Sequence, residues 1–197
     1  MKNFIKLNPI DELHLAFFPD FLDQQQADAF FKDLKSSIEW EQPIVKIFGK
    51  EHPVPRKVAF YGEPDVQYRY SGQTHTAIPW TESLQAIKSK IQESTPYEFN
   101  SVLLNFYRSG ADKMGWHADD EKVLGSNPII ISLNLGAERR MDFRDKKDHQ
   151  KKCSIQLPVG SLLIMLEDCQ HRFHHQIPMQ KRIKEERINL TFRQIKY

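Results

Sequence analysis

Residues 187–193 read RINLTFR and alternate strictly between polar and apolar side chains. Successive side chains of a β-strand point to opposite faces, so this stretch predicts a strand with one polar and one apolar face. The polar side chains are Arg187, Asn189, Thr191 and Arg193, and the apolar ones are Ile188, Leu190 and Phe192. Because a buried arginine is costly without an anion, the polar face predicts a cavity that holds a ligand with carboxylates at two points. An exposed face whose arginines pair with acidic residues is the alternative.

Similar strand-like runs fill the chain after Pro96, separated by Gly, Pro, Asn and Asp. They cover residues 101–107, 128–136, 154–157, 161–166 and 187–195. Two helices are expected before them, one over residues 23–38 with Asp23 as its N-cap and one after Trp80 that begins near Thr81 or Glu82. The pattern predicts a β-sandwich or barrel supported by two N-terminal helices.

Composition narrows the class of protein. The 197 residues suit one globular domain, no run approaches the ~20 apolar residues that cross a bilayer, and the first residues lack the pattern of a secretion signal. Two cysteines, Cys153 and Cys169, fit a reducing compartment and are too few for a thiolate metal site. The net charge is only +2, but basic residues concentrate in segments 46–57 and 139–152. They indicate a surface that faces a polyanion, with a solvated basic loop as the alternative.

The sequence WHADDE places His117 two residues before Asp119, so on a strand both side chains would point to the same side. With a distant second histidine from QHRFHHQIP, they match the two-histidine, one-carboxylate arrangement that suits non-haem Fe(II). Another same-face pair, Asn105 and Tyr107, could orient a small carboxylate ligand. Alternatively, the two side chains could satisfy each other's hydrogen bonds in the core. Taken together, three polar strand faces in an apolar β-shell predict a metal-centred cavity with a chelated dicarboxylate.

The order of these motifs resembles the AlkB family, Fe(II)- and 2-oxoglutarate-dependent nucleic-acid dealkylases. The motifs are N-x-Y at 105–107, H-x-D at 117–119, a histidine before a proline at 175–178, and R-x-N-x-T-x-R at 187–193. Upstream, FGKEHPVPRKVAFYG and YRYSG are similar to the branch that repairs duplex DNA, so the resemblance extends over residues 45–195. It implies Fe(II), 2-oxoglutarate and O2 as cofactor and co-substrates. By the same resemblance, the iron ligands are His117, Asp119 and His175.

The resemblance also implies which residues hold 2-oxoglutarate. Arg187, assisted by Tyr107, matches the arginine that pairs with the distal carboxylate. Arg193 and Asn105 match residues near the carboxylate next to the keto group, and Asn189 lies on the same wall. The implied reaction removes a methyl group from a base nitrogen, with succinate and formaldehyde as products.

Contacts to DNA follow from the same resemblance. Phe48 matches a wedge that fills the space of a base flipped out of the duplex, with a core phenylalanine as the alternative. Tyr70 resembles the aromatic that stacks on the flipped base, and Tyr68 could hydrogen-bond nearby, although both could be packing aromatics. Glu121, on a continued strand, could touch the base edge or be a solvated acid. The expected contacts to the DNA backbone are Lys50, Arg56 and Arg144.

We therefore expect a single α+β, mainly β domain over residues 1–197, with a double-stranded β-helix (jelly-roll) core at 98–197. A helical segment at 1–40 and a DNA-binding hairpin lid at 41–75 complete it. The expected function is oxidative dealkylation of DNA bases of the 1-methyladenine and 3-methylcytosine type by a monomer without a membrane partner, with duplex favoured over single strands. An RNA demethylase, a protein hydroxylase or a silent damage-binding module are the alternatives. A prokaryotic cytoplasm is the expected location, and a nucleus is the alternative.

Overall fold

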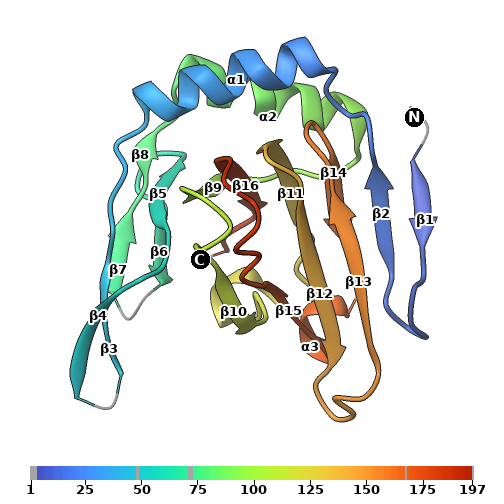
Figure 1. Ribbon diagram of the computed structural model, residues 1–197. Coiled ribbons are helices and arrows are strands. Elements are labelled where there is room, and N and C mark those ends of the chain that lie inside the picture. Colours follow the sequence, from blue (N-terminus) through green and yellow to red (C-terminus); the bar gives the residue numbers. More distant parts are fainter. Residues whose placement is uncertain (1–3, 48, 71–72, 167, 197) are drawn as a thin grey trace.

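The computed structural model describes residues 4–47, 49–70, 73–166 and 168–196. Over these ranges the chain forms a sheet of eight strands, a sheet of four strands and two separate hairpins. Two helices, α1 (Gln24–Ser37) and α2 (Glu82–Ser94), lie across the larger sheet (Figure 1). The mainly β, jelly-roll fold expected from the sequence is confirmed. None of the helices in the described ranges is long and apolar enough to span a membrane.

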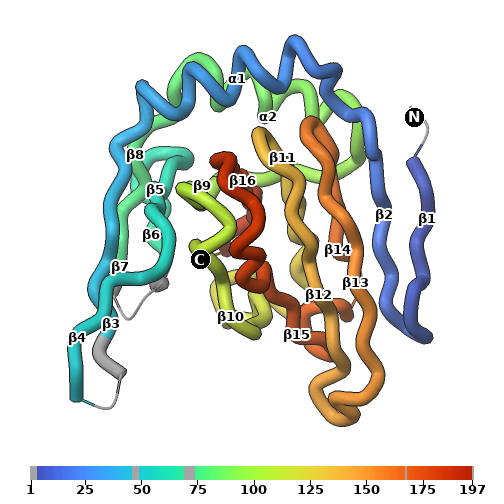
Figure 2. Tube along the Cα trace, viewed as in Figure 1, coloured from blue at the N-terminus to red at the C-terminus, as the bar shows by residue number. Residues whose placement is uncertain are grey.

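The larger sheet has the strand order β1-β2-β14-β11-β16-β9-β5-β8, and every pairing in it is antiparallel except β5 with β8. Its strands are β1 (Ile5–Leu7), β2 (Leu15–Phe18), β5 (Lys57–Gly62), β8 (Ile78–Pro79), β9 (Ser101–Tyr107), β11 (Ile130–Gly136), β14 (Leu162–Met165) and β16 (Arg187–Arg193). Strand β16 lies at the centre of this sheet between β11 and β9, which come much earlier in the chain (Figure 2).

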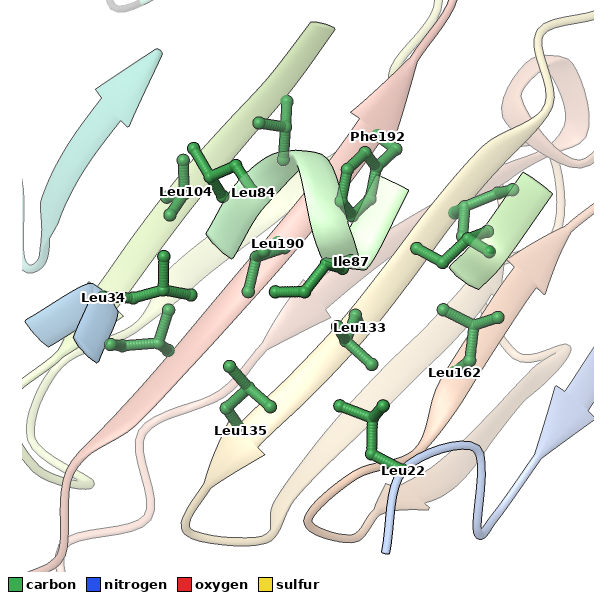
Figure 3. Close-up of a cluster of buried hydrophobic side chains, with 14 of the residues drawn as sticks. Leu22, Leu34, Leu84, Ile87, Leu104, Leu133, Leu135, Leu162, Leu190 and Phe192 are labelled. Carbon is green, nitrogen blue, oxygen red and sulfur yellow. The ribbon is translucent and has the colours of Figure 1, made fainter. Parts of the chain in front are cut away.

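Both helices begin at the caps that the sequence offers. The side chain of Asp23 accepts a hydrogen bond from the backbone N–H of Gln26 at the start of α1, and Thr81 accepts one from Leu84 at the start of α2. Each helix presents an apolar stripe to the larger sheet, where Leu34, Leu84 and Ile87 meet strand residues such as Leu133 and Leu190 (Figure 3). A second apolar cluster fills the space between the two sheets. The helices thus cover one face of the larger sheet, and its other face is turned toward the smaller sheet.

We expect Leu190→Ala to lower the free energy of unfolding by about 3 kcal/mol, because it opens a cavity in the cluster between helices and sheet. Leu190 is 0% exposed at the centre of that cluster. Urea denaturation measures the loss. Ile44→Ala is the control, since Ile44 is 57% exposed and its truncation should change stability by less than about 0.5 kcal/mol. Equal losses in the two variants would contradict this account of the core.

The smaller sheet has the order β10-β15-β12-β13 and faces the larger one. Its strands are β10 (Met114–His117), β12 (Arg139–Asp145), β13 (Lys152–Leu157) and β15 (Phe173–Ile177). A one-turn helix, α3 (Cys169–Arg172), directly precedes β15. Both cysteines are free, and burial raises the pKa of Cys169 to about 12 and that of Cys153 to about 11, so neither thiol is reactive near neutral pH.

Two of the expected segments contain strands that the sequence analysis did not expect. Residues 1–40 were expected to be helical, but they also contain β1 and β2, which extend the larger sheet beyond β14. The lid expected at 41–75 is interrupted by β5, a strand of the larger sheet that pairs with β9. What remains of that lid is two hairpins, β3 (Ile44–Ile47) with β4 (Lys50–Pro53) and β6 (Gln67–Tyr70) with β7 (Gln73–Thr76). Figure 1 shows the first of these hairpins projecting away from the helices.

Candidate active site

A pocket lies between the two sheets, and the polar face of β16 forms one of its walls. Arg187, Asn189, Thr191 and Arg193 all line this pocket, whereas the apolar residues of β16 pack under the helices. Every residue of β16 is buried, so the alternation predicted for this strand is confirmed and the exposed-face alternative is wrong. Strand β9 pairs with β16 and adds Asn105 and Tyr107 to the same wall.

Two histidines meet on the opposite sheet. His117, the last residue of β10, and His175, in β15, are partners across the antiparallel pair, and their imidazole centroids lie 4.2 Å apart. The Nδ1 atom of His117 lies 2.8 Å from the carbonyl oxygen of Gly115. A carbonyl can only accept, so Nδ1 carries the proton and Nε2 keeps a free lone pair. Nδ1 of His175 is buried without a hydrogen-bond partner in the described part of the chain.

Asp119 reaches the pocket from a loop. Strand β10 ends at His117, and a 3-10 turn begins after Glu121, so the expectation that Asp119 and Glu121 continue the strand is wrong. The backbone N–H of Asp119 instead donates to Oε1 of Gln170 in α3 at 2.9 Å, which holds the loop against the pocket. The carboxylate oxygen Oδ1 accepts a hydrogen bond of 2.9 Å from Arg193, and Oδ2 is buried without a partner among the described residues.

Burial and neighbouring charges set the protonation of these groups. Burial lowers the pKa of His117 and lowers that of His175 further, so both imidazoles are neutral near pH 7. Burial by itself would raise the pKa of Asp119, but its charged surroundings, with Arg193 foremost, outweigh burial and hold the pKa below its usual value. Arg193 in turn has a raised pKa, because Asp119 and Tyr68 outweigh the effect of its burial.

The donor set fits a non-haem iron ion. Two neutral imidazoles and one ionised carboxylate are the ligand types of an Fe(II) facial triad, and Nδ1 of His175 and Oδ2 of Asp119 are buried polar atoms with unused bonding capacity. Across the described ranges, no three His, Cys, Asp or Glu side chains converge closely enough to hold a metal ion as they stand.

At the other end of the wall, Arg187 is 1% exposed and donates from Nη2 to Oδ1 of Asn134. Its Nε and Nη1 atoms have no acceptor within the described chain. The guanidinium lies 5.0 Å from the ring centroid of Tyr107, and burial lowers the pKa of Arg187 to about 10, which still leaves it charged. A buried cation with unused N–H groups is a site for an anion.

Sequence reasoning missed several residues of this wall. Ser132 and Asn134 alternate with Ile131, Leu133 and Leu135 in β11, and Asn134 accepts from Arg187 while Asn189 donates to Ser132 at 2.8 Å. The polar positions of IISLNLG carry the same period-two signal as β16 and could have revealed them. Arg56, expected at the DNA backbone, donates from Nε to Oδ1 of Asn105 at 2.7 Å, a long-range contact that no local pattern encodes.

Of the remaining predicted residues, the four whose side chains the structure describes are not among those that line the pocket. Tyr68 is buried, and its hydroxyl hydrogen-bonds to the carboxyl group of Glu121. Burial and the charge of Asp119 raise the pKa of Glu121. Arg144, in β12, lies with its guanidinium carbon 4.3 Å from the centroid of Trp116, and Lys50 is exposed on β4. Phe48 lies outside the described residues, as does the side chain of Tyr70, whose backbone belongs to β6.

Neutral imidazoles beside a carboxylate suit iron, and buried arginines with unused N–H groups suit an oxo-dicarboxylic acid. Within a jelly roll, this pairing defines the class of Fe(II)- and 2-oxoglutarate-dependent oxygenases. The model of the 2OG-Fe(II) oxygenase superfamily matches residues 14–193. The chain belongs to this superfamily and, within it, to the AlkB family. It is therefore a dioxygenase that uses Fe(II), 2-oxoglutarate and O2, and the resemblance found in the sequence is confirmed.

Three mammalian proteins and one solved structure illustrate what this chain is similar to. The "Alpha-ketoglutarate-dependent dioxygenase alkB homolog 3" of Rattus norvegicus is 36% identical over 200 residues, which cover 97% of this chain and 67% of that protein. The "DNA oxidative demethylase ALKBH2" is 38% identical in Mus musculus over 86% of this chain and 75% of that protein, and 37% identical in Homo sapiens over 86% and 69%. The solved structure of OsALKBH1 covers 98% of this chain and 100% of that chain with a TM-score of 0.67 at 18% identity, which shows the shared fold.

Proposed function

We propose that this protein removes N-linked methyl groups from bases in DNA by oxidative demethylation. The observation that carries the proposal is one pocket that His117, His175 and Asp119 line together with two buried arginines. Relatives named DNA oxidative demethylases share more than a third of their aligned residues with this chain, which supports DNA as the substrate.

The residues of the pocket would have two tasks, to hold the iron ion and to bind 2-oxoglutarate. His117, His175 and Asp119 would hold the iron ion, which when bound supplies oxidation of the methyl group coupled to decarboxylation of 2-oxoglutarate to succinate. Arg187 and Tyr107 would bind the distal carboxylate of 2-oxoglutarate. Asn105 and Arg193 would lie near its other carboxylate, and Asn189 would complete that wall. The hydroxymethylated base would lose formaldehyde without a protein nucleophile, so the unreactive cysteines do not matter.

The methylated base would enter beside Tyr68 and Glu121. Bases such as 1-methyladenine and 3-methylcytosine carry a positive charge, and a cation next to Glu121 would favour its ionised form over the protonated form that burial favours. The base must leave the stack to reach the pocket, for which Tyr70 would provide a stacking surface. Lys50 and Arg144 would contact phosphates, while Arg56 would act mainly on Asn105.

The test is a repair assay on a duplex that carries one 3-methylcytosine. The protein is incubated with Fe(II), 2-oxoglutarate and O2, and both formaldehyde and restored cytosine are measured beside a matched single strand and a His117→Ala control. Repair that depends on His117 supports the proposal. Succinate without repaired base would move the substrate to RNA, protein or another lesion, and iron binding without either product would leave a damage-binding module.

We expect Phe48→Ala to reduce repair of duplex DNA more than repair of a single strand, by about tenfold in relative rate, because only the duplex has a vacated stack to fill. The measurement is the ratio of initial rates on the two substrates. The matched control is Phe4→Ala, an exposed aromatic that directly precedes the edge strand β1 of the larger sheet. Equal losses on both substrates would remove Phe48 from the wedge role.

A further inference from the structure

Arg139, the first residue of β12, is a buried arginine that neither the metal site nor the carboxylate sites use. It is 1% exposed, and its guanidinium makes four hydrogen bonds. Nε donates to Oε1 of Gln180 at 3.1 Å, and Nη1 donates to the carbonyl of Ser109 at 3.2 Å. Nη2 donates to the carbonyls of Asp112 at 2.9 Å and Pro178 at 2.7 Å.

These acceptors belong to the two loops that frame the distal end of the pocket. Ser109 and Asp112 lie in the loop between Tyr107 on β9 and the start of β10. Pro178 and Gln180 lie in the loop between β15 and Arg187 on β16. One guanidinium therefore ties together the segments that directly follow Tyr107 and directly precede Arg187. Five fixed N–H donors make arginine suited to such a clamp, which a lysine could satisfy only in part.

The same guanidinium also contacts the ring of Tyr107. Its carbon lies 5.5 Å from the ring centroid, and that of Arg187 lies 5.0 Å from it, so one phenol ring has two buried cations beside it. Cation–π contacts of this kind hold a ring in place and are strongest where water is excluded.

The charge of Arg139 is not neutralised by its hydrogen bonds. All four acceptors are carbonyl or amide oxygens. The neighbouring carboxylate of Asp112 is engaged by Arg108, whose Nε and Nη2 lie 2.8 Å from its two oxygens. Two buried guanidiniums around one ring leave an excess of positive charge at this end of the pocket, which favours a ligand that brings a negative charge there.

We propose that Arg139 is a positioning residue for the distal carboxylate of 2-oxoglutarate: it fixes Tyr107 and the two loops, and beside that ring it adds a second buried positive charge to that of Arg187. Arg139 thereby makes the site selective for oxo acids with a distal carboxylate. The inference rests on the proposed function in assigning Arg187 and Tyr107 to that carboxylate.

The test compares two oxo acids. Calorimetric titration of the Fe(II)-loaded protein without oxygen gives the Kd of 2-oxoglutarate and of 2-oxopentanoate, which has the same chain length but no distal carboxylate. We expect Arg139→Met to weaken the binding of 2-oxoglutarate by about tenfold, which corresponds to about 1.4 kcal/mol, and that of 2-oxopentanoate by less than about twofold. Arg139→Lys retains the charge and should keep the selectivity within about threefold of the wild type. In turnover, the KM for 2-oxoglutarate should rise with kcat unchanged at saturation.

Arg140→Met is the matched control, because Arg140 is the next residue, pairs with Asp142 at 2.8 Å and has a side chain 43% exposed. It should leave both affinities unchanged. Three results would overturn the proposal. They are unchanged selectivity in Arg139→Met, equal weakening of both acids in that variant, and a loss of selectivity in Arg139→Lys as large as that in Arg139→Met. If Arg139→Met does not fold, the lysine variant and Arg139→Gln provide the same comparison. Arg187→Met in the same titration separates the two ideas: if it leaves the 2-oxoglutarate affinity intact, the carboxylate assignment itself fails.

Discussion

Asp119→Ala is expected to reduce turnover of 2-oxoglutarate by at least about a thousandfold, because it removes the only carboxylate from the proposed iron ligands. The fold should persist with a lower free energy of unfolding, by about 3 kcal/mol, since Arg193 loses the buried partner that lies 2.9 Å away. Succinate formation measures the first effect and urea denaturation the second.

Two control variants separate these effects. Asp119→Asn retains an oxygen toward Arg193 and should lose turnover with a smaller loss of stability. Asp120→Ala removes the neighbouring acid, whose ion pair with Lys146 lies at the surface, and should change neither quantity appreciably. Normal turnover in Asp119→Ala would remove Asp119 from the ligand set.

Arg187→Met is expected to weaken the binding of 2-oxoglutarate by about a hundredfold, since two charge-assisted hydrogen bonds to a carboxylate are lost. In the absence of 2-oxoglutarate, the same change should raise the free energy of unfolding by about 1 kcal/mol. Arg187 is buried, and two of its nitrogens have no acceptor in the described chain, so an apolar side chain of similar length relieves the cost of that charge.

Calorimetry on the Fe(II)-loaded protein and urea denaturation of the metal-free protein check the two halves of this prediction. Arg140→Met again serves as the control, because it removes an equal charge from a half-exposed position. A variant that binds 2-oxoglutarate normally would contradict the role of Arg187. One that binds weakly but is also less stable would show that the arginine is a structural support.

Much of the site could be predicted from local pattern. The alternation in RINLTFR identified both faces of β16, and Asp23 and Thr81 identified the starts of both helices. These features depend on residues a few positions apart, where strand and helix geometry alone set the direction of each side chain. His175 was selected by the resemblance to the AlkB family, and it lines the pocket together with its cross-strand partner His117.

Other features depend on contacts between distant residues. Asp119 leaves the strand that its spacing from His117 suggested, and Gln170, 51 residues away, positions it instead. Arg56 contacts Asn105 across 49 residues, although its basic neighbours favoured a surface role. The resemblance to the AlkB family assigned residues 41–75 to a lid, yet the pairing of β5 with β9 places this strand in the larger sheet.

By itself, the sequence determined both long helices, several strands of the core and the two faces of β16, because these follow from residue type and short-range periodicity. The order of its motifs indicated the family. Only the tertiary structure decided which faces meet: Arg187 beside Tyr107 and Asn134, Asp119 against Arg193, and Arg139 beneath the two loops. The physical reason is that a buried charge takes whichever acceptor the packed sheets bring within reach, and that acceptor has no fixed distance along the chain.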